Sequence, residues 1–116
     1  MYLKKQHFIG VFKREIPFNP DDFHFRRLAA QCVTFSNPLN GRQYTVLWNT
    51  IIVKRHYTKV ILNTGGWRTV TTKKRINEQL RTYYIQQKDF EWYVLTKGEE
   101  DVTIRLPFKE NMTLID

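Results

Sequence analysis

The sequence predicts an α+β fold: a small antiparallel sheet of several short strands and hairpins, with two short helices at about residues 20–30 and 72–84. Three observations support this prediction. The chain has 116 residues, 41% of them hydrophobic, which suits a single domain over residues 1–116. Short runs rich in β-branched and aromatic residues alternate with turn signals. Two further segments carry apolar residues at helical spacing.

The first elements lie before residue 33. Residues 6–14, QHFIGVFKR, have the aromatic and β-branched content of a strand, in which Gly10 marks a weak point or a bulge. Asn19 can cap the helix over 20–30, Pro20 suits its first position, and the two aspartates that follow favour its positive end. One apolar face follows the spacing i, i+3, i+4, i+7, with residues Phe25, Leu28, Ala29 and Cys32.

Two hairpins are expected next. The runs CVTFS and QYTVLWN lie on either side of Asn40-Gly41, a strong hairpin turn signal. The runs TIIVK and YTKVILN flank Arg55-His56, which we expect at the second turn.

The second helix begins near Thr71 or Thr72, either of which can cap it. Its apolar positions follow the spacing i, i+4, i+7, i+8, with residues Ile76, Leu80, Tyr83 and Tyr84. Short β-prone runs follow at residues 84–90, 91–97, 101–108 and 112–115, and Gly98 predicts a turn among them.

Positive charge is concentrated around the second helix. Nineteen Lys or Arg against eleven acids give a net charge of +8, and residues 54–81 hold eight of these cations against the single acid Glu78. An anionic partner is therefore expected to approach this side of the molecule. The alternative is that the lysines only keep a small protein soluble.

The segment NTGGWRTVTTKKR predicts a phosphate-sized anion site. Glycines allow close backbone approach, and a helix N-terminus that already carries positive charge gains three cations, which is unfavourable unless an anion or solvent screens them. The site would comprise Gly65, Gly66, Trp67, Arg68, Thr71, Thr72, Lys73, Lys74 and Arg75, with Lys54, Arg55 and Lys59 extending the basic surface. The bland alternatives are a tight turn before a helix and a tryptophan that packs in the core.

Other chemistry finds little support in the sequence. The single cysteine excludes an intramolecular disulfide, the three histidines lie far apart, and we expect neither a metal nor a cofactor. No catalytic motif is present. Asp89 and Glu91 alternate on an expected strand and would suit a metal-dependent nuclease. The alternative is that acidic residues on a solvent-facing strand have no specific function. No apolar run is long enough to cross a membrane.

Residues 49–115 resemble a family of small uncharacterised proteins of tailed bacteriophages. The resemblance is carried by WNTIIVKRHYTKVILNTGGWRTVTTKKRINEQL, by QKDFEWYV and by FKENMTLI, with GGWRTVTTK as the specific part. It implies expression in the cytoplasm of a bacterial host, and it supplies no activity and no catalytic residues. Residues 1–47 have no counterpart in it and are expected to form an added subdomain.

Three functions remain open at this point. The first is binding of nucleic acid, DNA or RNA, mainly through its phosphates. The second is docking of the basic face on an acidic surface of a host protein, in defence or transcription machinery. The third is capture of a nucleotide in the Gly-Gly-Trp loop. Either a monomer or a dimer paired through a sheet edge is compatible with the sequence.

Overall fold

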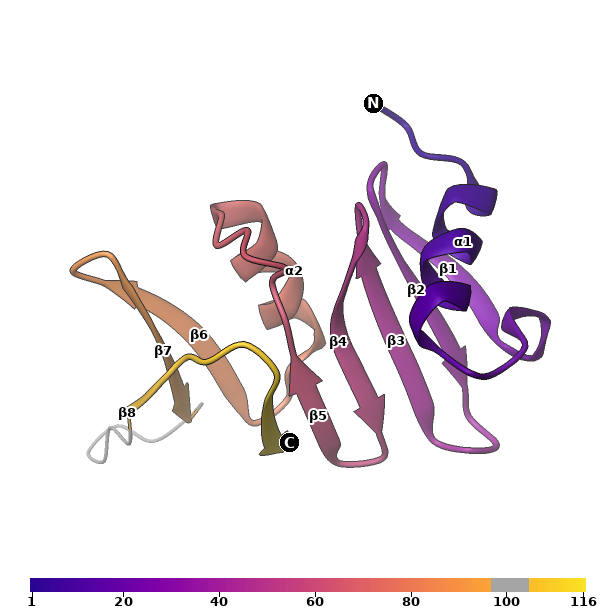
Figure 1. Cartoon of the computed structure of the whole chain (residues 1–116). Coiled ribbons are helices and arrows are strands. Elements are labelled where there is room, and N and C mark those ends of the chain that lie inside the picture. Colours follow the sequence, from indigo (N-terminus) through magenta and orange to yellow (C-terminus); the bar gives the residue numbers. More distant parts are fainter. Residues whose placement is uncertain (97–104) are drawn as a thin grey trace.

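The computed structural model describes residues 1–96 and 105–116 and has the α+β architecture that the sequence predicts (Figure 1). Six strands form one antiparallel sheet in the order β1-β2-β3-β4-β5-β9, and three form a second in the order β6-β7-β8. The helical elements are α1 (Lys5–Glu15), η1 (Pro20–Asp22, a 3-10 turn) and α2 (Val70–Gln79). The strands are β1 (His24–Ala29), β2 (Cys32–Asn37), β3 (Arg42–Leu47), β4 (Thr50–His56), β5 (Lys59–Leu62), β6 (Tyr83–Lys88), β7 (Glu91–Thr96), β8 (Arg105–Pro107) and β9 (Met112–Ile115).

The six-stranded sheet carries one helix on each face. Neighbouring residues of a strand point to opposite faces, and Cys32 and Val33 belong to different core clusters. On one face Val33 packs with Phe8 and Phe12 of α1. On the other face Cys32 packs with the α2 side chain Ile76 and with Trp92 of the three-stranded sheet. The central strands β2, β3 and β4 are therefore buried on both faces of the sheet, and the two helices lie on opposite faces.

The first two elements are the reverse of the expectation. Residues 5–15 form a helix where a strand was predicted, because Phe8, Val11 and Phe12 are spaced i, i+3, i+4 and all three are buried. Gly10 lies on the exposed side of this helix, where a side chain would meet nothing within 4 Å.

The helix predicted over 20–30 is also wrong. Its start signal is real, since the Asn19 side chain accepts a hydrogen bond of 3.0 Å from the Asp21 N–H and Pro20 takes the first position. The turn nevertheless ends at Phe23, and residues 24–29 pair with β2 as the edge strand of the sheet. Pairing with β2 therefore prevails over the helical spacing of Phe25, Leu28 and Ala29.

The second helix exists, but its limits differ from the prediction. It starts at Val70 rather than residue 72, and its cap is Thr69, whose hydroxyl accepts from the Thr72 N–H at 3.1 Å. Ile76 and Leu80 are buried as expected. The helix stops at Gln79, so Tyr83 and Tyr84 belong to β6 and not to the helical face.

Both hairpins are confirmed, with one change of turn. β2 pairs with β3 around Gly41, and β4 pairs with β5. The second turn lies at Tyr57-Thr58 instead of Arg55-His56, which are the last residues of β4. The turn predicted at Gly98 and the start of the strand predicted over 101–108 lie outside the described residues.

Asp89 is not on a strand, so the expected alternation with Glu91 is wrong. Asp89 and Phe90 form the turn between β6 and β7, and both have a positive φ, 52° and 67°. The boundary expected near residue 47 falls between β3 and β4, which pair with each other. A separate N-terminal subdomain stays a prediction.

Candidate nucleic-acid interface

The loop that joins β5 to α2, residues 63–69, is held by its own side chains. Asn63 Oδ1 accepts from the Gly65 N–H at 2.6 Å, and the Thr64 hydroxyl accepts from the Gly66 N–H at 3.2 Å. Both glycines have a positive φ, 63° and 87°, which side chains rarely adopt. The two glycine N–H groups are thus already bonded inside the loop, unlike the free anion-binding groups that the sequence suggested.

A carboxylate from the C-terminal part of the chain completes the loop. Glu110 accepts hydrogen bonds from the Thr64 N–H at 2.7 Å and from the Thr64 hydroxyl at 2.6 Å. Arg68 lies 3.8 Å from the same carboxylate and stacks over the ring of Phe108 at 5.1 Å. Arg68 is therefore engaged in holding the loop.

A pocket of about 320 Å³ opens between this loop and the turn that joins β3 to β4. Trp48 of this turn and Trp67 of the loop both line the pocket, with 45% and 70% of their surfaces exposed. Its other lining residues come from the β3–β4 segment and from the loop and first turn of α2: Leu47, Asn49, Thr50, Ile52, Thr64, Thr69, Thr71 and Thr72. We call this pocket the Trp pocket. The described residues that line it carry no formal charge.

Trp48 was not among the residues chosen from the sequence. Its place in the pocket depends on a positive φ of 55° at the β3–β4 turn and on a contact with α1, where His7 Nε2 lies 3.0 Å from the Trp48 carbonyl oxygen. The only local signal is the Trp48-Asn49 pair between two β-rich runs. A tryptophan with a left-handed backbone conformation is uncommon. Because the Trp48 side chain is also exposed, this turn is a candidate for binding.

The cations of α2 divide into two groups. Arg75 is paired with Glu78 at 3.0 Å, one turn further along the helix. Lys73 is half-buried and Lys74 exposed, and neither forms an ion pair within the part of the chain described. Lys73 and Lys74 are thus the cations next to the Trp pocket that remain available to an anion.

The residues predicted to extend this basic surface lie at the other end of the sheet. β4 starts with Thr50 at the Trp pocket and ends with His56. Lys54, Arg55 and Lys59 therefore lie near the β4–β5 turn, which is at the lower end of the strands in Figure 1. Six residues of strand span about 20 Å. Lys54 is paired with Glu15 of α1 at 3.3 Å. The structure does not join these three residues to the Gly-Gly-Trp loop.

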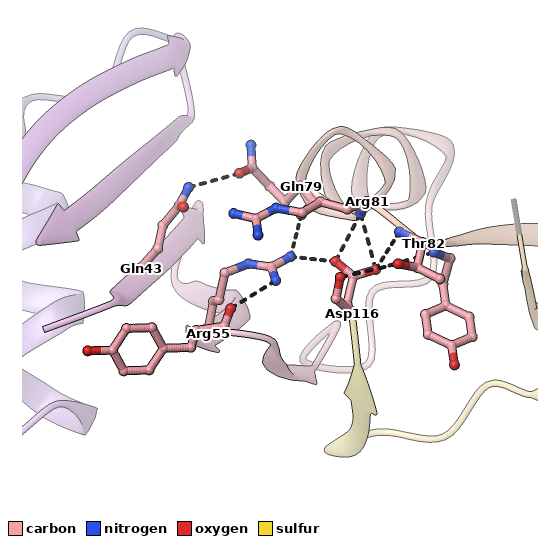
Figure 2. Close-up of polar contacts among 8 residues, drawn as sticks. Gln43, Arg55, Gln79, Arg81, Thr82 and Asp116 are labelled. Atoms are coloured by element: carbon pink, nitrogen blue, oxygen red, sulfur yellow. Dashed lines mark hydrogen bonds and ion pairs between the residues drawn. The ribbon is translucent and has the colours of Figure 1, made fainter. Parts of the chain in front are cut away.

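Arg55 is buried, with 5% of its surface exposed, and is part of a polar network around Asp116 (Figure 2). Its Nη2 donates to Asp116 Oδ2 at 2.6 Å and to the Gln79 carbonyl oxygen at 2.8 Å. The Asp116 carboxylate also accepts from the backbone N–H groups of residues 81–83, Arg81, Thr82 and Tyr83. Burial raises the pKa of Asp116, but these hydrogen bonds outweigh it and hold the pKa below its usual value.

Metal and thiol chemistry find no site in the described residues. They contain no group of three or more His, Cys, Asp or Glu side chains placed to hold a metal ion. Burial raises the pKa of Cys32 to about 11, against smaller opposing effects of Arg75 and Glu78, so this thiol is a packed core residue.

No helix of residues 1–96 or 105–116 is long and apolar enough to cross a membrane.

Comparison with known proteins shows similarity to a protein family. No curated protein and no solved structure is significantly similar to the chain. The family model described as Kyanoviridae Gp96 protein matches residues 21–115. This match includes β1, β2 and β3, which the resemblance in sequence had left out, whereas the GGWRTVTTK signature itself stays a prediction. With most of its length matched, the chain belongs to the Kyanoviridae Gp96 protein family of phage proteins.

Proposed function

We propose that this phage protein binds single-stranded nucleic acid in the cytoplasm of the infected bacterium, with an unstacked base held in the Trp pocket. One observation carries the proposal. Two tryptophans from separate segments, Trp48 and Trp67, keep much of their surface in water while they face one pocket. Exposing two large aromatic rings forfeits the favourable free energy of burying them, and base stacking is the interaction that such rings offer to single strands.

The pocket also has the size and chemistry for a base. Its volume of about 320 Å³ is that of a small-molecule site. Hydroxyl groups of Thr50 and Thr71 and the amide of Asn49 offer donors and acceptors without fixed charge, which suits a neutral ring better than a phosphate. The pocket thus takes the base, and the strand's phosphates need a separate cation.

Lys73 and Lys74 supply the positive charge for the phosphates of the strand. Both belong to the first turns of α2, whose N-terminus adds partial positive charge close to the pocket. A nucleotide whose base enters the pocket brings its phosphate close to this end of the helix. The proposed contacts therefore differ from the phosphate cradle suggested by the sequence, because the glycine N–H groups are already bonded.

The proposal is tested by fluorescence anisotropy of labelled single-stranded and double-stranded oligonucleotides. Tight binding of the single strand is expected, and Trp67→Ala is expected to weaken it by about 1–3 kcal/mol, the value of one stacked base. Phe90→Ala is the matched control, since Phe90 is 95% exposed but lies in the β6–β7 turn and does not line the pocket. Equal affinities of these two variants would contradict the assignment.

Salt dependence tests the role of the lysines separately. Removing two phosphate contacts with Lys73→Gln and Lys74→Gln should reduce the slope of log affinity against log salt by about 1.4 for a single strand. Lys88→Gln, an exposed cation at the end of β6, should leave the slope unchanged. A slope that is the same in all variants would place the phosphates elsewhere.

Docking on a host protein is the second candidate, and the exposed apolar residues favour it. Trp67 and Val70 lie three residues apart with 70% and 74% of their surfaces exposed. A tryptophan that is exposed in the free protein and becomes buried on binding is a common anchor of protein interfaces. Pull-down from nuclease-treated host lysate separates the two functions. A stoichiometric host protein that is retained by the unmodified chain and lost with Trp67→Ala would favour docking over nucleic acid.

A further inference from the structure

A second depression, of about 340 Å³, lies at the β4–β5 turn, which is at the lower end of the strands in Figure 1. Its lining includes Tyr44, Lys54, His56 and Lys59, and none of the described residues that line it is acidic. Arg55 also borders it, but the guanidinium of Arg55 belongs to the buried network of Figure 2. We call this depression the basic hollow.

The register of the strands places the other polar side chains of the hollow on one face of the sheet. Directly paired residues of neighbouring antiparallel strands point to the same face. Arg42 pairs with His56, and His56 pairs with Lys59. Tyr44 pairs with Lys54 in the next row, and the Tyr44 ring packs on α1. Both rows therefore project from the α1 face, with β3 and β5 each about 5 Å from β4.

Two cations in the first of these rows have no acidic partner. Lys54 is paired with Glu15 of α1 at 3.3 Å. Arg42 and Lys59 form no ion pair among the residues that the structure describes. The Arg42 guanidinium is instead held over the ring of Phe18 at 4.8 Å, in the segment that follows α1. Two positive charges thus remain uncompensated in one row of the sheet, where like charges oppose each other.

Tyr44 adds a neutral donor to the hollow. Only 5% of its surface is exposed, and its ring contacts those of Phe12 and Phe23. Its hydroxyl forms no hydrogen bond within the described part of the chain. Because Tyr44 lines the hollow, this hydroxyl is available to an oxygen atom of a ligand there.

We propose that the basic hollow binds the phosphate group of a phosphate monoester, with Arg42, Lys59 and the Tyr44 hydroxyl as its ligands. A phosphate monoester carries between one and two negative charges near pH 7, which two cations match. Arginine presents paired N–H donors that fit phosphate oxygens, and lysine binds phosphate as a point charge. The proposal does not rest on nucleic-acid binding at the Trp pocket, because the two sites share no residue and lie on opposite faces of the sheet.

Two sources of such a phosphate share this chemistry: a free nucleotide and the 5′-phosphate end of a nucleic acid. Titration of the 15N-labelled full chain distinguishes them. The probes, at constant ionic strength, are inorganic phosphate, a nucleoside 5′-monophosphate, and oligonucleotides with and without a 5′-phosphate. Tighter binding of the monophosphate assigns the site to free nucleotides, and tighter binding of the 5′-phosphorylated strand assigns it to nucleic-acid ends.

The expected result is saturable binding of the phosphate monoesters, with shifts of the backbone amide signals near Arg42, His56 and Lys59. Arg42→Gln should weaken binding about tenfold or more, the effect of losing one hydrogen-bonded charge. Arg26→Gln is the matched control, since Arg26 is an exposed arginine of the same sheet that does not line the hollow. This control should bind as the unmodified chain does.

Tyr44→Phe tests the hollow without changing its charge. It should weaken binding about tenfold, the effect of one hydrogen bond to a charged group. The midpoint of urea unfolding should not fall, because the hydroxyl has no hydrogen-bond partner in the free protein. A loss of affinity without a loss of stability assigns the hydroxyl to the ligand.

Trp67→Ala should leave binding at the hollow intact, so failure of the Trp pocket and failure of the hollow are told apart. The proposal is overturned if no monoester binds saturably, or if Tyr44→Phe binds as tightly as the unmodified chain. Equal losses in Arg42→Gln and Arg26→Gln would also overturn it, because they would indicate general attraction to a basic protein. So would equal binding of the two oligonucleotides with shifts of the same amide signals.

Discussion

Asp116→Asn tests how much of the fold's stability rests on the network at the end of α2. The Asp116 side chain is fully buried, with four donors directed at its two oxygens: Arg55 Nη2 and the N–H groups of residues 81–83. An asparagine in the same place removes the charge that balances Arg55. In either orientation its NH2 group faces an N–H donor, because each carboxylate oxygen accepts at least one of these bonds.

The magnitude follows from the burial of Arg55. Breaking a buried ion pair by removing one partner costs about 3–5 kcal/mol. Arg55 keeps two carbonyl acceptors, Tyr57 and Gln79, so we expect the lower end, about 3 kcal/mol, against a total of about 5–15 kcal/mol for a typical domain. Urea unfolding followed by circular dichroism measures it.

Two controls make this prediction specific. Glu78→Gln breaks the more exposed Arg75–Glu78 pair and should cost less than about 1 kcal/mol. Arg55→Gln combined with Asp116→Asn should be less destabilising than the sum of the single changes, because neither partner is then left as an unpaired buried charge. A loss below about 1 kcal/mol for Asp116→Asn would refute the reasoning, as would additivity in the double variant.

Three further predictions concern pH, the start of α2 and the buried thiol. Because the pKa of Asp116 is lowered in the folded protein, its contribution to the free energy of unfolding is present above the pKa of an unfolded aspartate and is lost as pH falls through the folded-state pKa. The free energy of unfolding should therefore fall less on acidification in Asp116→Asn than in the unmodified chain. Thr69→Ala should destabilise the protein by about 1 kcal/mol through loss of the helix cap, whereas Thr71→Ala, at an exposed position without that role, should be nearly neutral in the same urea experiment. Cys32, with a pKa of about 11 in place of 9.0, should react with a disulfide reagent at least about a hundredfold more slowly in the native state than in urea, and equal rates would contradict its burial.

The parts of the fold that follow from the sequence are those with local causes. Asn40-Gly41 marked the β2–β3 turn because the turn needs a positive φ, which Gly41 has at 68°. The start of α2 was predicted to within two residues because threonines that can cap a helix cluster there, although the cap is Thr69 rather than Thr71 or Thr72. These signals act over a few positions, so they can be recognised without knowledge of the rest of the chain.

The errors come from contacts that are distant in sequence. Residues 24–29 have helical spacing but pair with β2, and residues 6–14 have strand composition but bury one helical face against the sheet. The end of α2 is set by Asp116, which binds the N–H groups of residues 81–83 more than thirty positions earlier. A single sequence contains no indication that these groups meet.

The candidate site was found only in part for the same reason. The Gly-Gly-Trp loop and the first turn of α2 do line a pocket. Its other wall, Trp48, is brought there by the pairing of β3 with β4, and the basic residues that seemed to extend the site lie at the far end of the sheet. Spacing in the sequence therefore located the Gly-Gly-Trp side of the pocket. It did not identify Trp48 as a second lining tryptophan, nor which basic residues lie near the pocket.

The most direct test of the Trp pocket is a double-mutant cycle with Trp48→Ala and Trp67→Ala, read out as affinity for a single-stranded oligonucleotide. If one base lies between the two rings, each change should weaken binding, and the double variant should lose less than the sum of the two, with a coupling of at least about 0.5 kcal/mol. Affinity that is unchanged by Trp48→Ala, or two losses that simply add, would show that the tryptophans do not hold a common base and would contradict the account.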